Sequence, residues 1–208
     1  KRPDLDPGAF FDYWRNKHPA VVTQLPGLRQ YVQSHSKTSD APWDGMAEVW
    51  FDSIDDMRRN ADCEELDRVR EDERNFIDGN SMQSLICEEH VIVDGDPGEA
   101  TVKIIILVPK LADVTAEKFQ TVYRDEIGPM VQANPFVHRY VQAHCRLGFY
   151  RGDRKPVFDA ISALWFADTD AQQQAFTHES LAPAPAMEAT IMDNPGIGFM
   201  AVNEHRII

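Results

Sequence analysis

The feature of this sequence that most restricts its fold is an internal repeat. When the chain is shifted by 109 residues, residues 1–35 align without a gap on residues 110–144, and ten of these 35 positions are identical. Roughly two identities would be expected by chance at average composition. The identical positions include three alternating side chains in each copy: Tyr31, Gln33 and His35, and Tyr140, Gln142 and His144.

A later block of the repeat aligns at a shift of 115 residues. Trp50 then matches Trp165, and Glu89-His90 matches Glu204-His205. Between the copies lies a Gly/Pro/acidic segment typical of a linker. We therefore divide the chain into a first repeat, a linker and a second repeat, over residues 1–93, 94–101 and 102–208.

Only the second repeat has an opening strand. Residues 102–109 (VKIIILVP) are predicted to form a buried strand, and the equivalent segment would precede Lys1. A missing strand leaves an unpaired sheet edge, which folded proteins avoid. We expect that the opening strand of the first repeat has been trimmed or lost.

Each repeat shows the element order of a βαββαβ unit, which forms a four-stranded antiparallel sheet with helices on one face. In the first repeat we predict helices over residues 7–25 and 53–76, and strands over residues 28–35, 46–52 and 85–93. One such sheet leaves its second face bare. We therefore expect an α+β fold in which two ferredoxin-like repeats pack as an intrachain α+β barrel.

Composition limits the partners and the compartment. The chain has 208 residues and a formal net charge of −13 at pH 7, which disfavours binding to nucleic acid or to an anionic membrane. Its three cysteines are widely spaced, so neither a disulfide framework nor a structural zinc site is expected, and a reducing, cytoplasmic location is favoured. The internal barrel removes the need for dimerisation but permits a homodimer.

The segment over residues 11–32 (FDYWRNKHPAVVTQLPGLRQYV) resembles the EthD family, within the dimeric α+β barrel superfamily. The resemblance rests on an aromatic-rich helix, a histidine and a Leu-Pro-Gly-Leu strand entry, and it extends to residues 73–78 (ERNFID). It is weaker in the second repeat, and it implies a tandem, fused form of the family. Relatives include polyketide cyclases, dehydratases, decarboxylases, an isomerase and cofactor-free monooxygenases, so the fold does not fix the function.

His18 is the residue that we expect to move a proton. It corresponds to the family's helix histidine, and imidazole titrates near neutral pH. The second repeat has Ile127 at this position and Ala163 where the first has Glu48. These differences favour a single working site, in the first repeat. A surface histidine at a helix end is the plainer interpretation of His18.

The other candidate residues lie on the predicted strands and the first helix. We expect Tyr31, His35 and Glu48 to join His18 as catalytic groups. The alternative for the repeated Tyr-Gln-His pattern is structural hydrogen bonding. Flat aromatic walls and further hydrogen-bonding groups for a substrate are expected from Trp14, Trp50, Tyr140, His144 and Trp165.

The sequence contains no GxGxxG, GxxxxGK[ST], GxSxG or HExxH motif, and no metal-ligand spacing was recognised. The resulting expectation is a cofactor-independent enzyme without a metal. It would act by elimination, cyclisation, decarboxylation or isomerisation on a small hydrophobic compound, aromatic or polyketide-like. The alternatives are a cofactor-free monooxygenase of phenolic substrates and a non-catalytic, stress-responsive binding module.

Overall fold

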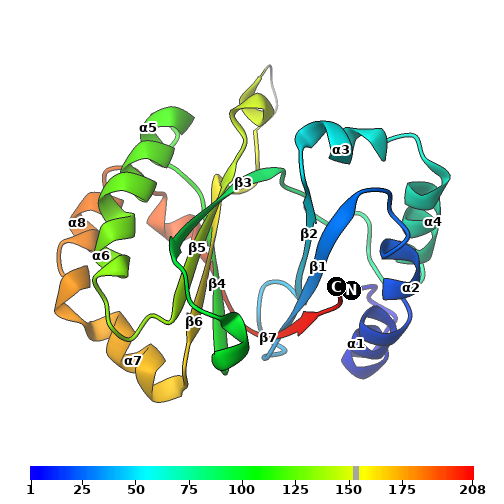
Figure 1. Ribbon diagram of the computed structural model, residues 1–208, viewed down its shortest axis with the longest axis horizontal. Coiled ribbons are helices and arrows are strands. Elements are labelled where there is room, and N and C mark those ends of the chain that lie inside the picture. Colours follow the sequence, from blue (N-terminus) through cyan, green and yellow to red (C-terminus); the bar gives the residue numbers. More distant parts are fainter. Residues whose placement is uncertain (152–154) are drawn as a thin grey trace. The chain divides into compact units, whose positions relative to one another are not determined.

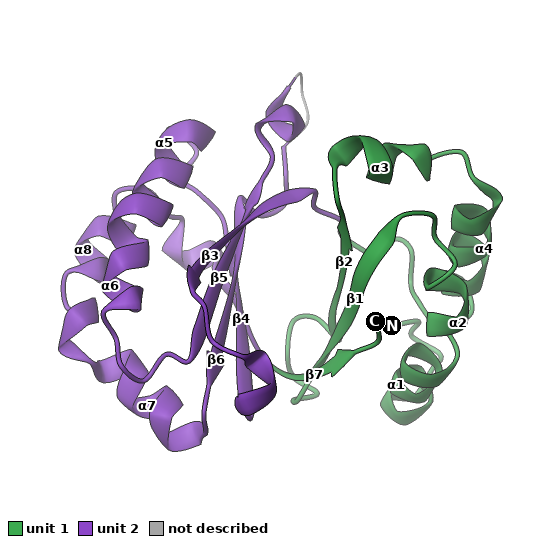
Figure 2. Ribbon diagram, viewed as in Figure 1, with its two compact units in different colours: residues 1–83, 202–208 green, residues 84–201 purple. Residues whose placement is uncertain are grey.

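The computed structural model describes residues 1–151 and 155–208. The chain forms two compact units (Figure 2). Unit 1 comprises residues 1–83 and 202–208, and unit 2 comprises residues 84–201. Both combine antiparallel strands with helices, so the α+β class is confirmed. The two ferredoxin-like repeats and their closure into a barrel stay predictions.

Unit 1 is built around the strand β1, Leu28–Ser36. On one side β1 pairs antiparallel with β2, Gly45–Phe51, and on the other with residues 202–206 of β7, Gly198–Arg206. The helices of unit 1 lie on one side of these strands (Figure 1). They are α1 (Pro7–Asn16), α2 (Pro19–Val22), α3 (Ile54–Arg59) and α4 (Glu64–Glu73).

Unit 2 contains four paired antiparallel strands in the order β4-β6-β5-β3. They are β3 (Cys87–Val93), β4 (Val102–Val108), β5 (Arg139–Cys145) and β6 (Ala160–Phe166). The longer helical segments are α5 (Ala116–Val122), the π-helical turn η2 (Tyr123–Ile127), α6 (Gly128–Gln132), α7 (Thr169–Thr177) and α8 (Ala184–Glu188). Short 3-10 turns are η1 (Pro97–Glu99), η3 (Leu147–Tyr150), η4 (Glu179–Leu181) and η5 (Asn194–Gly196).

The last strand of each predicted repeat lies in the unit formed mainly by the other repeat. In unit 2, β3 pairs with β5 and places His90 opposite Gln142. In unit 1, the end of β7 pairs with β1 and places His205 opposite Gln33. The compact units therefore do not coincide with residues 1–93 and 102–208.

Proline and capping residues explain where the helices of unit 1 begin. Asp6 accepts a hydrogen bond from the Ala9 N–H and caps α1, whose first residue is Pro7. The single helix expected over residues 7–25 is interrupted before Pro19, because proline has no N–H to continue the α1 ladder. His18 stands at this interruption, between α1 and α2.

Each unit has its own buried apolar cluster between sheet and helices. In unit 1, Phe10, Trp14 and Phe76 pack together. Their counterparts at the repeat shifts are Phe119, Tyr123 and Ile191, which form part of one cluster in unit 2. Within residues 1–151 and 155–208, no helix has the length and apolar character needed to cross a membrane.

Candidate functional site

Three side chains on β1 form a buried hydrogen-bonded chain on the face that carries the helices. The amide nitrogen of Gln33 donates to the Trp14 carbonyl at 2.7 Å and to the Tyr31 hydroxyl at 2.8 Å. The oxygen of the same amide lies 3.1 Å from His35 Nε2. Because this oxygen can only accept, His35 must carry its proton on Nε2.

The His35 ring is enclosed by other rings. It stacks on Phe11 and Trp14, with centroids 4.9 and 4.4 Å away, and meets His205 edge-on at 4.6 Å. Burial, followed by the nearby His205 and Arg15, lowers the pKa of His35 to about 4. The imidazole is therefore neutral at physiological pH.

Unit 2 repeats this arrangement. The Gln142 amide nitrogen donates to the Tyr123 carbonyl at 3.0 Å and to the Tyr140 hydroxyl at 2.7 Å, and its oxygen lies 2.9 Å from His144 Nε2. His90 meets His144 edge-on at 4.8 Å. The same hydrogen bonds in both units agree with the structural interpretation of the Tyr-Gln-His pattern.

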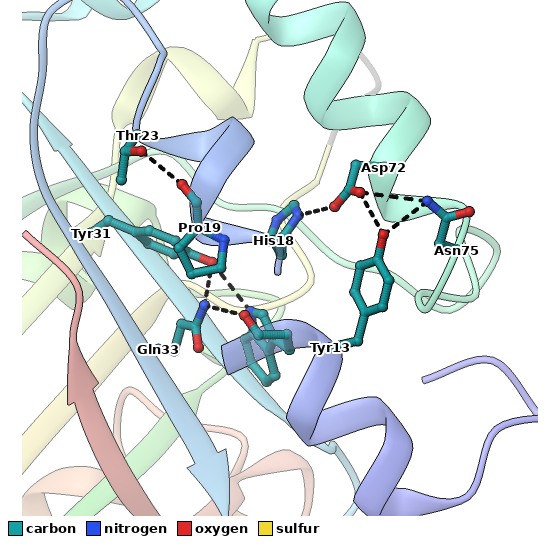
Figure 3. A network of polar contacts seen from close by, with 9 residues as sticks. Tyr13, His18, Pro19, Thr23, Tyr31, Gln33, Asp72 and Asn75 are labelled. Atoms are coloured by element: carbon teal, nitrogen blue, oxygen red, sulfur yellow. Dashed lines mark hydrogen bonds and ion pairs between the residues drawn. The ribbon is translucent and has the colours of Figure 1, made fainter. Parts of the chain in front are cut away.

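A second polar group, around His18, is particular to unit 1. His18 Nδ1 lies 2.7 Å from a carboxylate oxygen of Asp72 in α4 (Figure 3). The other oxygen of Asp72 accepts from the Tyr13 hydroxyl at 2.7 Å, and Asn75 donates to that hydroxyl at 3.1 Å. The group joins α1, α4 and the break between α1 and α2.

Burial and the Asp72 carboxylate act in opposite directions on His18. Its side chain is buried, and this desolvation lowers the pKa of His18 below 6.5, although Asp72 partly offsets the effect. Burial alone would raise the pKa of Asp72, but the hydrogen bonds from Tyr13 and His18 outweigh it and leave that pKa lowered. A neutral His18 donates through Nδ1 to the Asp72 carboxylate and keeps a lone pair on Nε2, the arrangement of a general base.

The Tyr31 hydroxyl lies on the same side of the sheet. It accepts hydrogen bonds from Gln33 and, at 3.3 Å, from the indole N–H of Trp14. Burial raises the pKa of Tyr31, so its proton is retained at neutral pH. Among the described residues no acceptor receives that proton, so Tyr31 can donate it to a ligand oxygen.

Three members of the His18 group have apolar counterparts in unit 2. Val122, Ile127 and Met187 occupy the positions of Tyr13, His18 and Asp72, and they belong to or pack against one apolar cluster. The Tyr140 hydroxyl also has a hydroxyl partner there, because Ser162 Oγ lies 3.2 Å from it and 2.5 Å from the Tyr123 hydroxyl. Ser162 corresponds to Ala47 in unit 1.

Both tyrosines are buried, but the strand residues beside them differ in exposure. Val49, the β2 residue paired with Tyr31, is 46% exposed, and Ala47 beside it is also exposed. The corresponding Leu164 is 6% exposed and Ser162 is fully buried. The helix-bearing face of β2 is therefore open to solvent beside Tyr31.

The structure brings some of the sequence-predicted residues together and separates others. Trp14, His18, Tyr31 and His35 gather on the helix-bearing face of β1. Glu48 pairs with Val32, and its carboxylate lies 3.4 Å from the Ser34 hydroxyl, so it points to the opposite face.

Trp50 shares the face of Glu48, because it lies two residues along β2. Trp165 likewise lies on the opposite face of its sheet from Tyr140 and His144. It packs with Val141 and Ala163 and carries the Lys103 ammonium over its ring. The candidate site therefore excludes Glu48, Trp50 and Trp165, while Tyr140 and His144 belong to the matching network of unit 2.

Sequence analysis missed Asp72, Tyr13 and Gln33 as parts of the site. Asp72 lies 54 residues from His18, and only the fold brings it close. One signal was available, since His18, Tyr13 and Asp72 are among the positions at which a polar residue of the first repeat corresponds to an apolar residue of the second. In the described part of the chain, no group of three or more His, Cys, Asp or Glu side chains could hold a metal ion.

Antiparallel strands with helices on one face define an α+β protein, and a part-buried His–Asp pair lies among the helices of unit 1. Residues 2–80 match the model of the EthD domain, which supports assignment of this part of the chain to the EthD family. No curated protein sequence matches the chain at a significant level.

Several solved structures share the fold at low sequence identity. A "putative monooxygenase" from Lactobacillus acidophilus NCFM is 12% identical, with a TM-score of 0.57 over 94% of this chain and 89% of that one. An "anthrone oxidase-like protein" is 11% identical, with a TM-score of 0.63 over 96% and 86%. A "putative monooxygenase" from Fusobacterium nucleatum subsp. nucleatum ATCC 25586 is 8% identical, with a TM-score of 0.59 over 98% and 87%.

These comparisons correct the leading functional expectation. The three structures carry the names of oxygen-using enzymes, whereas the sequence led us to expect a lyase, cyclase, decarboxylase or isomerase. That expectation was wrong, because proton transfer at a histidine is common to many reaction types and does not select among them.

Proposed function

We propose that unit 1 contains the active site of a monooxygenase that oxidises a small phenolic or related aromatic compound. The observation that carries the proposal is the pair of buried His18 and half-buried Asp72, in which a neutral imidazole keeps a free Nε2 lone pair. The names of the structural neighbours support oxygen chemistry over other uses of such a base.

The reaction can draw its electrons from the substrate. A phenol-activated CH2 group loses a proton to His18 Nε2, and the resulting carbanion transfers electrons to O2. A C–O bond forms, a hydroperoxide results after protonation, and loss of water leaves a carbonyl. The net change is R2CH2 + O2 → R2C=O + H2O, in which the substrate carbon is oxidised and O2 is reduced.

Each residue of the site has a distinct role in this scheme. His18 accepts the proton, and Asp72 is a positioning residue that holds the Nδ1–H and supports the positive imidazolium. Tyr31 donates its spare proton to the substrate oxygen on which negative charge develops. The open face of β2 beside Tyr31, with Val49 exposed, offers an apolar surface for the aromatic ring.

The test is oxygen uptake with a panel of anthrones and related polyphenols. We expect one O2 consumed per substrate, and one atom of ¹⁸O2 in the product carbonyl. Tyr31→Phe should reduce kcat by roughly tenfold to a hundredfold, since one hydrogen bond to a developing oxyanion is lost. Turnover of such compounds without uptake of oxygen, or binding without turnover, would contradict the proposal.

The pH profile tests His18 separately. Only neutral imidazole accepts a proton, so kcat/KM should fall as the pH drops through the lowered pKa of His18, below 6.5. Asp72→Asn removes the negative charge that raises this pKa, so the acid limb should move to lower pH as kcat falls. An unmoved limb would show that Asp72 has only a structural role.

We also propose that the two units arose from two copies of one module. The chain is a fused pair of EthD-like modules, over residues 1–93 and 102–208, of which the second has lost its acid–base group. The matching hydrogen bonds of Gln33 and Gln142 support this interpretation. A cytoplasmic location also belongs to the proposal.

A further inference from the structure

Two of the three cysteines lie directly opposite each other in unit 2, although 58 positions separate them in the sequence. Cys87 on β3 is paired with Cys145 on β5 in the antiparallel register. Directly opposed residues project from the same face of a sheet, so both thiols lie on one side.

The neighbouring backbone hydrogen bonds show whether Cys87 and Cys145 form a hydrogen-bonded or a non-hydrogen-bonded pair of the antiparallel ladder. The Arg146 N–H donates to the Ile86 carbonyl, which makes the neighbouring pair the hydrogen-bonded one. The Cys145 N–H points away from β3 and donates to Asp159. Hydrogen-bonded and non-hydrogen-bonded pairs alternate along an antiparallel ladder, so Cys87 and Cys145 occupy a non-hydrogen-bonded position.

Such a position suits a disulfide. Its Cα atoms are about 4.5 Å apart, within the range that disulfides span, and its side chains approach more closely than in a hydrogen-bonded pair. We infer that Cys87 and Cys145 form a modification site, at which oxidation links β3 to β5 through a reversible disulfide.

Unit 1 provides a natural comparison for this site. At the repeat shifts, Cys145 corresponds to Ser36 and Cys87 to Val202, and these two residues are paired in the register of β1 with β7. The same position thus exists in both units, but only unit 2 has thiols there. Serine and valine are therefore suitable replacements for Cys145 and Cys87.

The chemistry begins at Cys87, because it is partly accessible whereas Cys145 is fully buried. The Cys87 thiolate attacks a small disulfide such as oxidised glutathione, which forms a mixed disulfide and releases one glutathione. Cys145 then loses its proton and attacks the Cys87 sulfur, which forms the protein disulfide and releases the second glutathione. Two protein thiols are oxidised, and the small disulfide is reduced to two thiols.

Burial controls the second step. Burial, assisted by the nearby Asp159 carboxylate, raises the pKa of Cys145 to about 11. The thiolate is the attacking species, so ring closure should accelerate as the pH rises toward this value. At neutral pH the pair should oxidise slowly.

The experiment treats the folded, reduced chain with oxidised glutathione and counts thiols after denaturation. We expect Cys87 and Cys145 to lose their thiols, with a monomeric product whose unreduced peptide map links Cys87 to Cys145. Closing this loop should raise Tm by roughly 10 °C. Three remaining thiols, a bond that includes Cys63, or a bond between two chains would overturn the inference.

Variants keep the test independent of folding. Cys63→Ser should form the same bond, because Cys63 caps α4 by accepting from the Leu66 N–H and serine can take over that role. Cys145→Ser should stop at the glutathione adduct on Cys87, and Cys87→Val should leave the buried Cys145 as a free thiol. Circular dichroism confirms that each variant is folded, and an adduct on Cys145 in place of Cys87 would contradict the proposed order.

Discussion

Units 1 and 2 each contain a copy of the same buried hydrogen-bond network, to which unit 1 adds a histidine–aspartate pair. In both, a glutamine on the second strand of the repeat bonds a tyrosine, a histidine and a carbonyl of the first helix. Unit 1 adds His18, Asp72 and Tyr13 to this network, whereas unit 2 has Ile127, Met187 and Val122.

Comparison of the two units distinguishes residues that stabilise the fold from residues that can act as acids or bases. A histidine whose pKa is about 4 or about 3, as for His35 and His144, is a poor base at neutral pH. His18 has a carboxylate partner that opposes the effect of burial. The repeated glutamines and histidines are therefore structural, whereas the candidate site combines the repeated Tyr31 with the unrepeated His18 and Asp72.

The largest effect should follow from replacing His18 by its unit 2 counterpart. His18→Ile removes the general base, so kcat/KM should fall by roughly 10²- to 10⁴-fold. His18→Ile alone leaves the Asp72 carboxylate without its histidine partner. The double variant His18→Ile/Asp72→Met removes that carboxylate as well and should be equally inactive. Oxygen uptake measures the loss, and thermal unfolding checks the fold. Retention of most activity in a folded variant would remove His18 from the mechanism.

Acid should destabilise the folded chain through His144 in unit 2 more than through its counterpart His35 in unit 1. The folded-state pKa values of about 3 for His144 and about 4 for His35 lie below the usual 6.5, chiefly through burial, so protonation favours the unfolded chain. The loss begins as the pH falls below 6.5 and continues to each folded pKa. It is on the order of 5 kcal/mol for His144 and 3 kcal/mol for His35.

Denaturant unfolding between pH 7 and pH 3 measures this loss, and the two histidines differ only below about pH 4. His144→Phe should flatten the pH dependence of stability in unit 2, and His35→Phe should do so in unit 1. An unchanged dependence in both variants would contradict the assignment to these histidines.

A smaller effect should come from Gly45, which pairs with His35 on β2. A Cβ at this position would lie 2.3 Å from the Ser34 carbonyl oxygen and 2.9 Å from the Trp14 indole. Gly45→Ala should therefore cost about 2 kcal/mol through overpacking. The counterpart Ala160 faces Tyr123 in place of a tryptophan, and Ala160→Gly should cost about 1 kcal/mol. Urea unfolding of both variants tests the contrast, and equal costs would contradict it.

The smallest effect should come from giving unit 1 the hydroxyl that unit 2 has. Ala47→Ser places a hydroxyl at the position from which Ser162 bonds the tyrosine hydroxyl in unit 2. The Tyr31 hydroxyl then has a competing partner, and kcat should fall roughly tenfold with Tm nearly unchanged. Ala47→Val is the control, because it adds volume without an acceptor. An equal fall in both variants would attribute the effect to crowding.

The sequence predicted much of the local structure, because its signals are local. The repeat, the apolar spacing and the Pro-Gly stop after residue 25 placed the main helices and strands close to their observed positions. The opposite faces of β1 also follow from alternation, so Tyr31, Gln33 and His35 were correctly grouped.

The site was predicted only in part, because its remaining contacts join distant elements. The pairing of His18 with Asp72 depends on how α4 packs beside α2, which no local pattern specifies. Glu48 and Trp50 were assigned to the site because strand alternation shows which residues share a face, but not which of the two faces carries the helices.

The exchange of final strands also determines the order in which the two units can complete folding during translation. Unit 1 cannot complete its sheet until residues 202–208 exist, and these are translated after all of unit 2. During translation, the β1 edge that β7 later covers is unpaired while its histidine network lacks His205. Long-range pairing of this kind slows folding and exposes aggregation-prone edges, so a ribosome-bound chain that stops before β7 should depend on chaperones.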